Sequence, residues 1–115
     1  MKRDMNLVRE LLFLAEADGD DAELCKKYGR EVVAGHTAIL LDAGLVEGAV
    51  GTGSDGKPIA SEIVRLTWAG HEFLDNARND TIWNKAISTI KEKSISVSFD
   101  VLAALLKSLV SSSLC

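Results

Sequence analysis

The spacing of hydrophobic residues in the first part of the chain predicts two helices. Over residues 4–17, apolar side chains recur every three or four positions, as on the buried face of an amphipathic helix. Residues 30–43 follow the same rule, and Gly44 is placed to terminate that helix. Residues 22–28 between them fit a short strand or a short helix equally well.

The middle of the chain predicts a β-hairpin. Strands are expected over residues 45–52 and 62–66, and the second has the β-branched residues Ile63 and Val64. A loop rich in glycine and turn-forming residues joins them over 51–58. Gly56-Lys57 within that loop is followed by Pro58 instead of serine or threonine, and no helix follows, so we interpret the loop as a hairpin tip and not as a phosphate-binding loop.

Helices are expected again after the hairpin. Thr67 suits the N-cap of a helix over 67–78, and Asp80 or Thr81 opens the next one. Ser98 is expected to cap a final helix. The expected apolar stripes of the last two helices are Ile82, Trp83, Ala86, Ile87 and Ile90, then Leu102, Leu105, Leu106 and Leu109.

This order of elements predicts a mostly α fold with a small β-hairpin, of the α+β class. A winged helix-turn-helix has the order helix, short element, helix, hairpin and helix, and this chain adds C-terminal helices to it. We expect residues 1–78 to form the winged-helix core and residues 79–115 to form a helical extension. The extension would pack on the core, or alternatively at a dimer interface.

Composition narrows the class of protein. The 115 residues suit one domain with a buried core, because 47% of them are hydrophobic. A net charge of −4, from 17 acidic and 13 basic residues, does not indicate a basic nucleic-acid-binding face. Cys25 and Cys115 lack zinc-site spacing, and we expect a reducing, cytoplasmic setting. The apolar run from Phe99 to Val110 is too short to span a bilayer.

Candidate chemistry is sparse. His36 lies at the centre of the apolar face of helix 30–43, where a histidine is more often a buried, hydrogen-bonded core residue than a catalyst. His71 is expected either at the surface or under the hairpin, and the metalloprotease spacing of two histidines is absent. The turn Asp18–Asp21 lacks EF-hand spacing, which favours a solvated acidic turn. We therefore expect no enzyme activity, no metal and no cofactor.

Several phrases of the sequence resemble the DUF2513 family of small bacterial and prophage proteins. They are Met1–Arg9, Tyr28–Gly48, Leu66–Asp75 and Asp80–Lys85, and the phrase Leu-Thr-Trp-Ala-Gly-His-Glu-Phe-Leu is the most specific. The resemblance covers nearly the whole chain, although residues 18–27 match poorly. It implies a winged-helix-like fold and an origin in a mobile element, and it brings no catalytic residues.

Helix 30–43 is the expected interaction surface. The positions opposite His36 are small or acidic and include none of the arginine, lysine, asparagine or glutamine side chains that usually contact base edges. Such a face would let a second helix approach closely, so we expect a protein partner or a homodimer and no membrane. The expected interaction face is Glu31, Ala34, Gly35, Ala38 and Asp42.

Nucleic acid is the alternative partner. Three basic residues cluster just before helix 30–43, and a fourth lies at the hairpin tip. Lysine and arginine at such positions would neutralise a few phosphates. The alternative hypothesis is thus a DNA-binding transcriptional regulator that contacts phosphates through Lys26, Lys27, Arg30 and Lys57.

Overall fold

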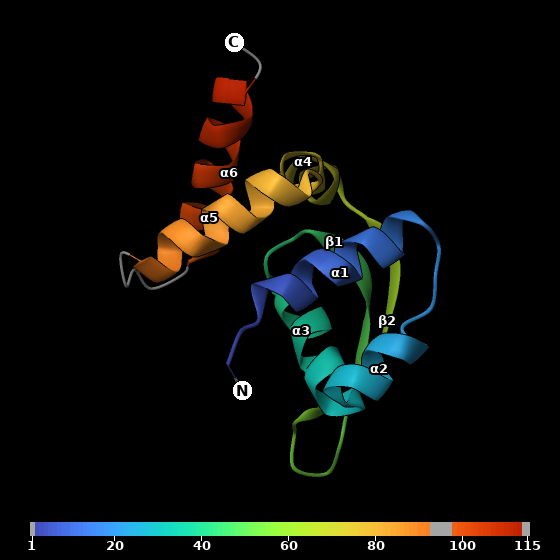
Figure 1. The fold of residues 1–115 in the computed structure, drawn as a ribbon. Helices are drawn as coiled ribbons and strands as arrows, with labels where there is room; N and C mark the ends of the chain where they lie inside the picture. The colour runs from blue at the N-terminus through green and yellow to red at the C-terminus, as the bar shows by residue number, and fades with distance from the viewer. Residues whose placement is uncertain (1, 93–97, 114–115) are drawn as a thin grey trace. The chain divides into compact units, whose positions relative to one another are not determined.

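The computed structural model describes residues 2–92 and 98–113. Within these stretches the chain is mostly helical with one two-stranded antiparallel hairpin, as the sequence predicts (Figure 1). It divides into two compact units, Met1–His71 and Glu72–Cys115. The sequence places the boundary seven residues later, after residue 78. The elements are α1 (Met5–Glu16), α2 (Ala22–Tyr28), α3 (Arg30–Asp42), β1 (Val46–Thr52), β2 (Pro58–Leu66), α4 (Trp68–Ala77), α5 (Asp80–Glu92) and α6 (Phe99–Ser113).

Helix α1 begins and ends with side-chain and backbone caps. The Asp4 carboxylate accepts the backbone N–H groups of Asn6 and Leu7 at 2.9 and 3.3 Å, which satisfies two donors of the first turn. At the other end, the Gly19 N–H donates to the Leu14 carbonyl at 2.9 Å, and the Asp18 N–H donates to Ala15 at 3.4 Å. This pair of bonds is a Schellman motif, which turns the chain sharply away from the helix axis.

The segment that fits a strand or a helix equally well is helix α2. A single residue, Gly29, separates it from α3, and its φ of 92° is a conformation that side chains with a Cβ rarely adopt. The chain therefore leaves one helix and enters the next within one residue.

Helix α3 is the centre of the first unit. It contacts α1, α2, β1 and β2. Its middle is consequently buried around its whole circumference, and the buried residues are Val33, Ala34, Gly35, His36, Thr37 and Leu40. The helix ends where expected, because the Gly44 and Leu45 N–H groups donate back to Leu41 and Leu40.

The hairpin is longer on its second strand than the sequence predicts. Strand β2 begins at Pro58, not at residue 62, because Pro58, Ala60 and Ser61 pair with the far half of β1. The register shifts twice, between Glu47 and Gly48 and between Gly51 and Thr52. Both shifts are β-bulges, and the loop between the strands projects beyond α2 and α3 (Figure 1).

Capping residues also define the helices after the hairpin. The hydroxyl of Thr67 accepts the Gly70 N–H at 3.1 Å, and that of Ser98 accepts the Val101 N–H at 3.1 Å, so both predicted caps are confirmed. The cap of α5 is Asn79, whose side chain accepts the Ile82 N–H at 3.0 Å. Helix α5 thus starts at Asp80, one of the two starts that the sequence allows.

The second unit has its own apolar contacts. Helices α5 and α6 lie against each other, and the rings of Phe73 and Phe99 are 4.5 Å apart between centroids. Trp83, Leu102 and Leu106 are buried within the single chain, as the preferred interpretation of their stripes requires. Cys115 lies outside the described residues.

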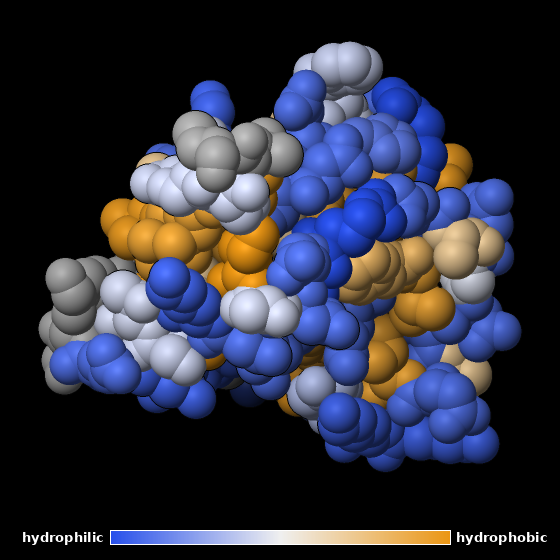
Figure 2. All heavy atoms as spheres, turned by 45° about the horizontal axis from the view of Figure 1, so that its top comes forward, coloured by the Kyte–Doolittle hydropathy of each residue, from blue (hydrophilic) through white to orange (hydrophobic). Residues whose placement is uncertain are grey.

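Most of the surface on the face drawn in Figure 2 is polar, with hydrophobic patches between the polar side chains. Three large hydrophobic residues are exposed in the described part of the chain, namely Val64, Trp68 and Val101. Single exposed hydrophobic residues are normal on a soluble protein. Val64 differs because it also borders a cavity.

A candidate protein-binding groove

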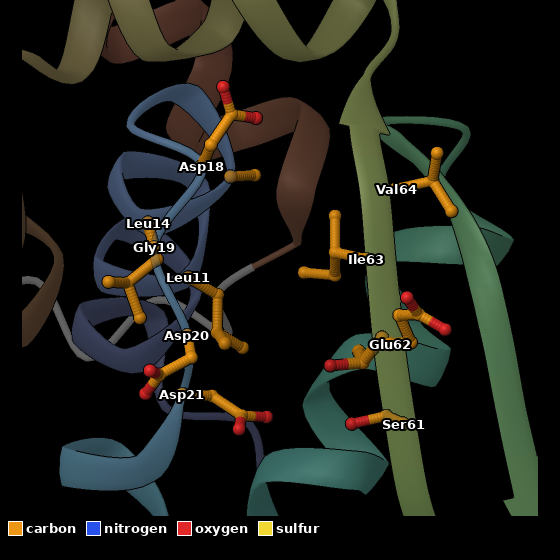
Figure 3. Close-up of a pocket in the computed structure, with 12 residues that line it drawn as sticks. Leu11, Leu14, Asp18, Gly19, Asp20, Asp21, Ser61, Glu62, Ile63 and Val64 are labelled. Carbon is orange, nitrogen blue, oxygen red and sulfur yellow. The ribbon is translucent and has the colours of Figure 1, made fainter.

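A groove in the first unit separates the α1–α2 turn from strand β2 (Figure 3). Its volume is about 290 Å³, just below the range typical of small-molecule sites, roughly 300–1,000 Å³. The end of α1, the turn, one residue of α3 and four consecutive residues of β2 form its walls. The lining residues are Leu11, Leu14, Ala15, Asp18, Gly19, Asp20, Asp21, Thr37, Ser61, Glu62, Ile63 and Val64.

The turn holds three carboxylates on one wall. The Schellman motif places Asp18 at a φ of 54°, in the left-handed region, where glycine is the usual residue. Asp20 turns away from β2, and its carboxylate accepts the Ala22 N–H at 2.9 Å (Figure 3). The Asp21 carboxylate extends toward β2 (Figure 3).

Asp21 also influences the nearby Cys25. Partial burial raises the pKa of the Cys25 thiol above its ordinary value, and the charge and hydrogen bond of the Asp21 carboxylate raise that pKa further. Arg30 acts in the opposite direction. The Cys25 thiol is therefore mostly protonated near neutral pH.

Strand β2 forms the opposite wall. Ser61 and Ile63 point toward the turn, whereas Glu62 and Val64 point away from it (Figure 3). The first bulge leaves Val64 without a partner on β1, since Glu47 pairs with Arg65 and Gly48 pairs with Ile63. The Val64 side chain is 65% exposed at the border of the groove.

The edge of β2 opposite β1 is open. Its sheet has two strands, so β2 pairs with β1 on one side only. Alternate residues of such a strand direct their N–H and C=O groups away from the partner strand. In the described residues, Ser61–Val64 form no backbone hydrogen bond to any element besides β1.

The groove is negatively charged. Asp18, Asp20, Asp21 and Glu62 line it, and no lysine or arginine does. Within the described ranges none of the four forms an ion pair. The nearest basic residue along β2, Arg65, is already engaged, because its guanidinium bonds the Glu47 carboxylate through two nitrogens at 2.9 and 2.6 Å.

Neither histidine takes part in this groove. His36 is fully buried, as predicted, and hydrogen bonds occupy both ring nitrogens: Nε2 accepts the Asp4 N–H at 2.9 Å, and Nδ1 lies 2.8 Å from the Val32 carbonyl. His71 is exposed, which is one of its two predicted locations. Among residues 2–92 and 98–113 no group of three or more histidine, cysteine or acidic side chains is arranged to hold a metal ion.

The predicted interaction face of α3 requires a correction. Glu31 and Asp42 are exposed and Ala38 is half-buried, but Ala34 and Gly35 are buried. Their outward placement is wrong because α3 has neighbours on all sides. Both residues lie in the buried middle of a helix that contacts four other elements of the first unit.

The four predicted phosphate contacts are all exposed. Lys26 forms a surface ion pair with Glu23 at 3.5 Å, and the Lys27 ammonium lies 5.1 Å from the centre of the Tyr28 ring. Exposed contacts of this kind stabilise a protein by at most about 1 kcal/mol, so they do not prevent the two lysines from binding an anion. Solvent and anions can reach all four residues, Lys26, Lys27, Arg30 and Lys57.

The groove itself was missed by the sequence analysis. The turn Asp18–Asp21 was interpreted as solvated, and the second strand was expected to start at residue 62. The one available signal was the set of acidic residues after a helix, where a carboxylate meets the negative end of the helix dipole. Nothing local in the sequence placed that turn opposite β2.

The fold and the groove together define a small, mostly helical α+β protein with an open sheet edge. The chain belongs to the DUF2513 family, whose model, described as "Hypothetical protein (DUF2513)", matches residues 2–96. It is similar to an "Uncharacterized protein" of Haemophilus influenzae, with 33% identity over 116 residues that cover 96% of this chain and 97% of that protein. No solved structure matches the chain.

In the part of the chain that the structure describes, each helix is too short or too polar to cross a membrane.

Proposed function

We propose that this protein is a non-catalytic binding protein and that its partner is another protein, held in the groove between the α1–α2 turn and β2. The open edge of β2 carries the proposal. Ser61–Val64 line a cavity, and no third strand engages the backbone groups that they direct away from β1 within the described residues. Backbone groups of this kind are a ready template for a segment of another chain.

The composition of the groove supports a binding role over a catalytic one. Its lining includes carboxylates but no histidine, cysteine, lysine or arginine. General acid–base catalysis most often uses histidine, and the two ring nitrogens of the buried His36 already have partners. The carboxylates supply charge for recognition, and the groove lining holds no histidine or lysine that could activate the Ser61 or Thr37 hydroxyl.

We propose in addition that the first unit is a variant winged helix, because the order α1, α2, α3, β1 and β2 is the order of that fold. In the usual docking mode, outward side chains of the helix equivalent to α3 contact base edges in the major groove. Here residues 33–37 are buried, and the exposed Glu31 and Asp42 are acidic. Both facts favour a protein partner over duplex DNA.

Site-specific photo-crosslinking in the host cell tests the proposal. A photoreactive residue replaces Glu62, which borders the groove on β2, or Glu31 on α3 as the matched control, since both are exposed glutamates outside ion pairs. We expect a discrete adduct with a second protein from position 62 and none from position 31. The proposal is overturned if position 62 gives no adduct, or if position 31 gives the same one.

A duplex-DNA titration at low salt tests the alternative in parallel. Tight binding that is sensitive to salt and is lost on combined Lys26→Ala, Lys27→Ala and Arg30→Ala replacement would establish the DNA-binding regulator instead.

A further inference from the structure

We infer that the occupant of the groove is an extended, lysine- or arginine-rich peptide segment that pairs with the open edge of β2 as a third strand. The inference rests on the proposed protein-binding function and specifies the chemistry of the partner. Three properties of the groove lead to it: unpaired backbone groups, length and shape, and charge.

The open backbone groups of β2 favour an extended peptide over a helical one. A helix satisfies its own backbone groups, whereas an extended segment presents N–H and C=O groups that complement those of Ser61–Val64. Where it lines the groove, the strand also lacks two of the usual devices that protect an open edge, lysine and proline. No lysine or proline lies within Ser61–Val64, and Pro58 protects only the first residue of β2.

The dimensions of the groove fit a short extended segment. Four consecutive residues of β2 line it, and a strand rises about 3.3 Å per residue, so the paired stretch is about 13 Å long. The bulge at Val64 interrupts the regular ladder there and marks one end of the stretch. Side chains of an added strand alternate between two faces, so every second residue of the peptide would point toward the α1 wall.

The side chains that line the groove determine which peptide side chains fit it. Leu11, Leu14 and Ile63 supply an apolar surface, which suits valine or isoleucine at alternate positions of the peptide. Asp18 and Asp21 lie on the turn and Glu62 borders the groove from β2, and none of the three has a cationic partner in the described chain. Lysine or arginine at the remaining positions would supply those partners and steer the peptide to the groove.

Fluorescence anisotropy with synthetic peptides tests the inference directly. The probe is a labelled hexapeptide of alternating lysine and valine, and the matched controls are glutamate–valine and lysine–glycine hexapeptides. We expect binding of the lysine–valine peptide that weakens with salt, about tenfold weaker binding of the lysine–glycine peptide, and none of the glutamate–valine peptide. Equal binding of all three would overturn the inference.

A backbone-methylated probe separates strand addition from simple charge attraction. N-methylation of alternate peptide bonds removes N–H donors and leaves the charge and the side chains unchanged. We expect loss of binding when the methylated edge is the one that pairs with β2, and retention when the opposite edge is methylated. If both methylated peptides bind like the parent, no strand is added and the inference is wrong.

Protein variants locate the site. Combined Asp21→Asn and Glu62→Gln replacement removes two charges at the groove, and we expect about tenfold weaker binding. Combined Glu31→Gln and Asp42→Asn replacement makes the same charge change on α3, and we expect affinity within about twofold of the parent protein. A larger loss with the α3 pair than with the groove pair would place the peptide elsewhere and overturn the inference.

The two proposals fail separately. If the peptides do not bind but the photoreactive residue at position 62 still captures a different protein, the groove binds proteins and only the basic extended occupant is wrong. If the adduct has twice the mass of this chain, the occupant is a second copy paired through β2, which also overturns the basic peptide. If both experiments give nothing, the proposed function falls as well.

Discussion

The backbone N–H of Asp4 donates a hydrogen bond of 2.9 Å to Nε2 of His36, which lies 32 positions further along the chain. Because Nε2 accepts this bond, the ring proton resides on Nδ1, from which it is donated to the Val32 carbonyl at 2.8 Å. The neutral ring of His36 therefore ties the start of α1 to the interior of α3. The Asp4 side chain caps α1 at the same point.

Replacement of His36 by alanine should strongly destabilise the protein. The change leaves the Asp4 N–H without a partner and opens a cavity at a fully buried position. We expect the free energy of unfolding to fall by about 2–4 kcal/mol. Urea unfolding followed by circular dichroism measures it. His71→Ala is the control and should change stability by less than about 0.5 kcal/mol, because His71 is exposed. Equal effects of the two changes would contradict the assignment.

Replacement of Gly70 by alanine should destabilise α4 although alanine is the better helix former. The Cβ of an alanine there would overlap the carbonyl oxygen of Leu45. The gain in helix propensity is about 1 kcal/mol at most, and we expect a net loss of about 1–3 kcal/mol in thermal or urea unfolding. Gly51→Ala is the matched control, because a Cβ there meets Ala60 no closer than 3.8 Å. A stabilised Gly70→Ala protein would show that the close approach does not exist.

These two residues illustrate how much of the fold the sequence could predict. Periodicity and caps located α1, α3, the hairpin and the Thr67 and Ser98 caps, because those signals are local. His36 was correctly expected in the core for the same reason. Gly70 counted against a helix in the sequence, yet it is required there by a neighbour 25 positions earlier, which no local pattern includes.

The candidate site was less predictable, because it depends on long-range neighbours. Ala34 and Gly35 were expected outside since the face opposite His36 lacks large apolar residues. The middle of α3, which contacts four elements, has no free face, and we interpret its small residues as a consequence of packing against those elements. The bulge at Val64 depends on the register of β2 against β1, which tertiary contacts decide.

Replacement of Asp18 by glycine should stabilise the fold and weaken the groove. Asp18 has a φ of 54° and lies beyond the C-terminal end of α1, where its charge opposes the helix dipole. Glycine relieves both effects, and we expect about 1 kcal/mol of added stability in urea unfolding. Asp18→Asn removes the charge and keeps a side chain that tolerates this conformation, so its gain should be smaller. A loss of stability in Asp18→Gly would show that the carboxylate contributes a favourable contact.

The same change links stability to the proposed function. If Asp18 is retained for its charge in the groove, both variants should bind the lysine–valine peptide more weakly than the parent protein. Natural proteins commonly keep unfavourable residues at functional sites for this reason.

Alkylation of Cys25 should be slow, and the Asp21 carboxylate should account for part of the low rate. Burial and the Asp21 carboxylate raise the pKa of the thiol, so the reactive thiolate is scarce near neutral pH. In a Cys115→Ser background, we expect iodoacetamide to react more slowly with the folded protein than with the urea-unfolded chain. The rate should rise with pH, and the midpoint of that rise should lie at a higher pH than for an ordinary thiol.

Asp21→Asn removes the charge but leaves the burial, which is the larger cause of the raised pKa. The midpoint of the pH–rate profile should therefore fall only part of the way toward its ordinary value, while Asp100→Asn on α6 serves as a control that should leave it unchanged. A folded protein that reacts faster than the unfolded chain near neutral pH would contradict the raised pKa. A midpoint that does not move in Asp21→Asn would show that Asp21 has no influence on the thiol.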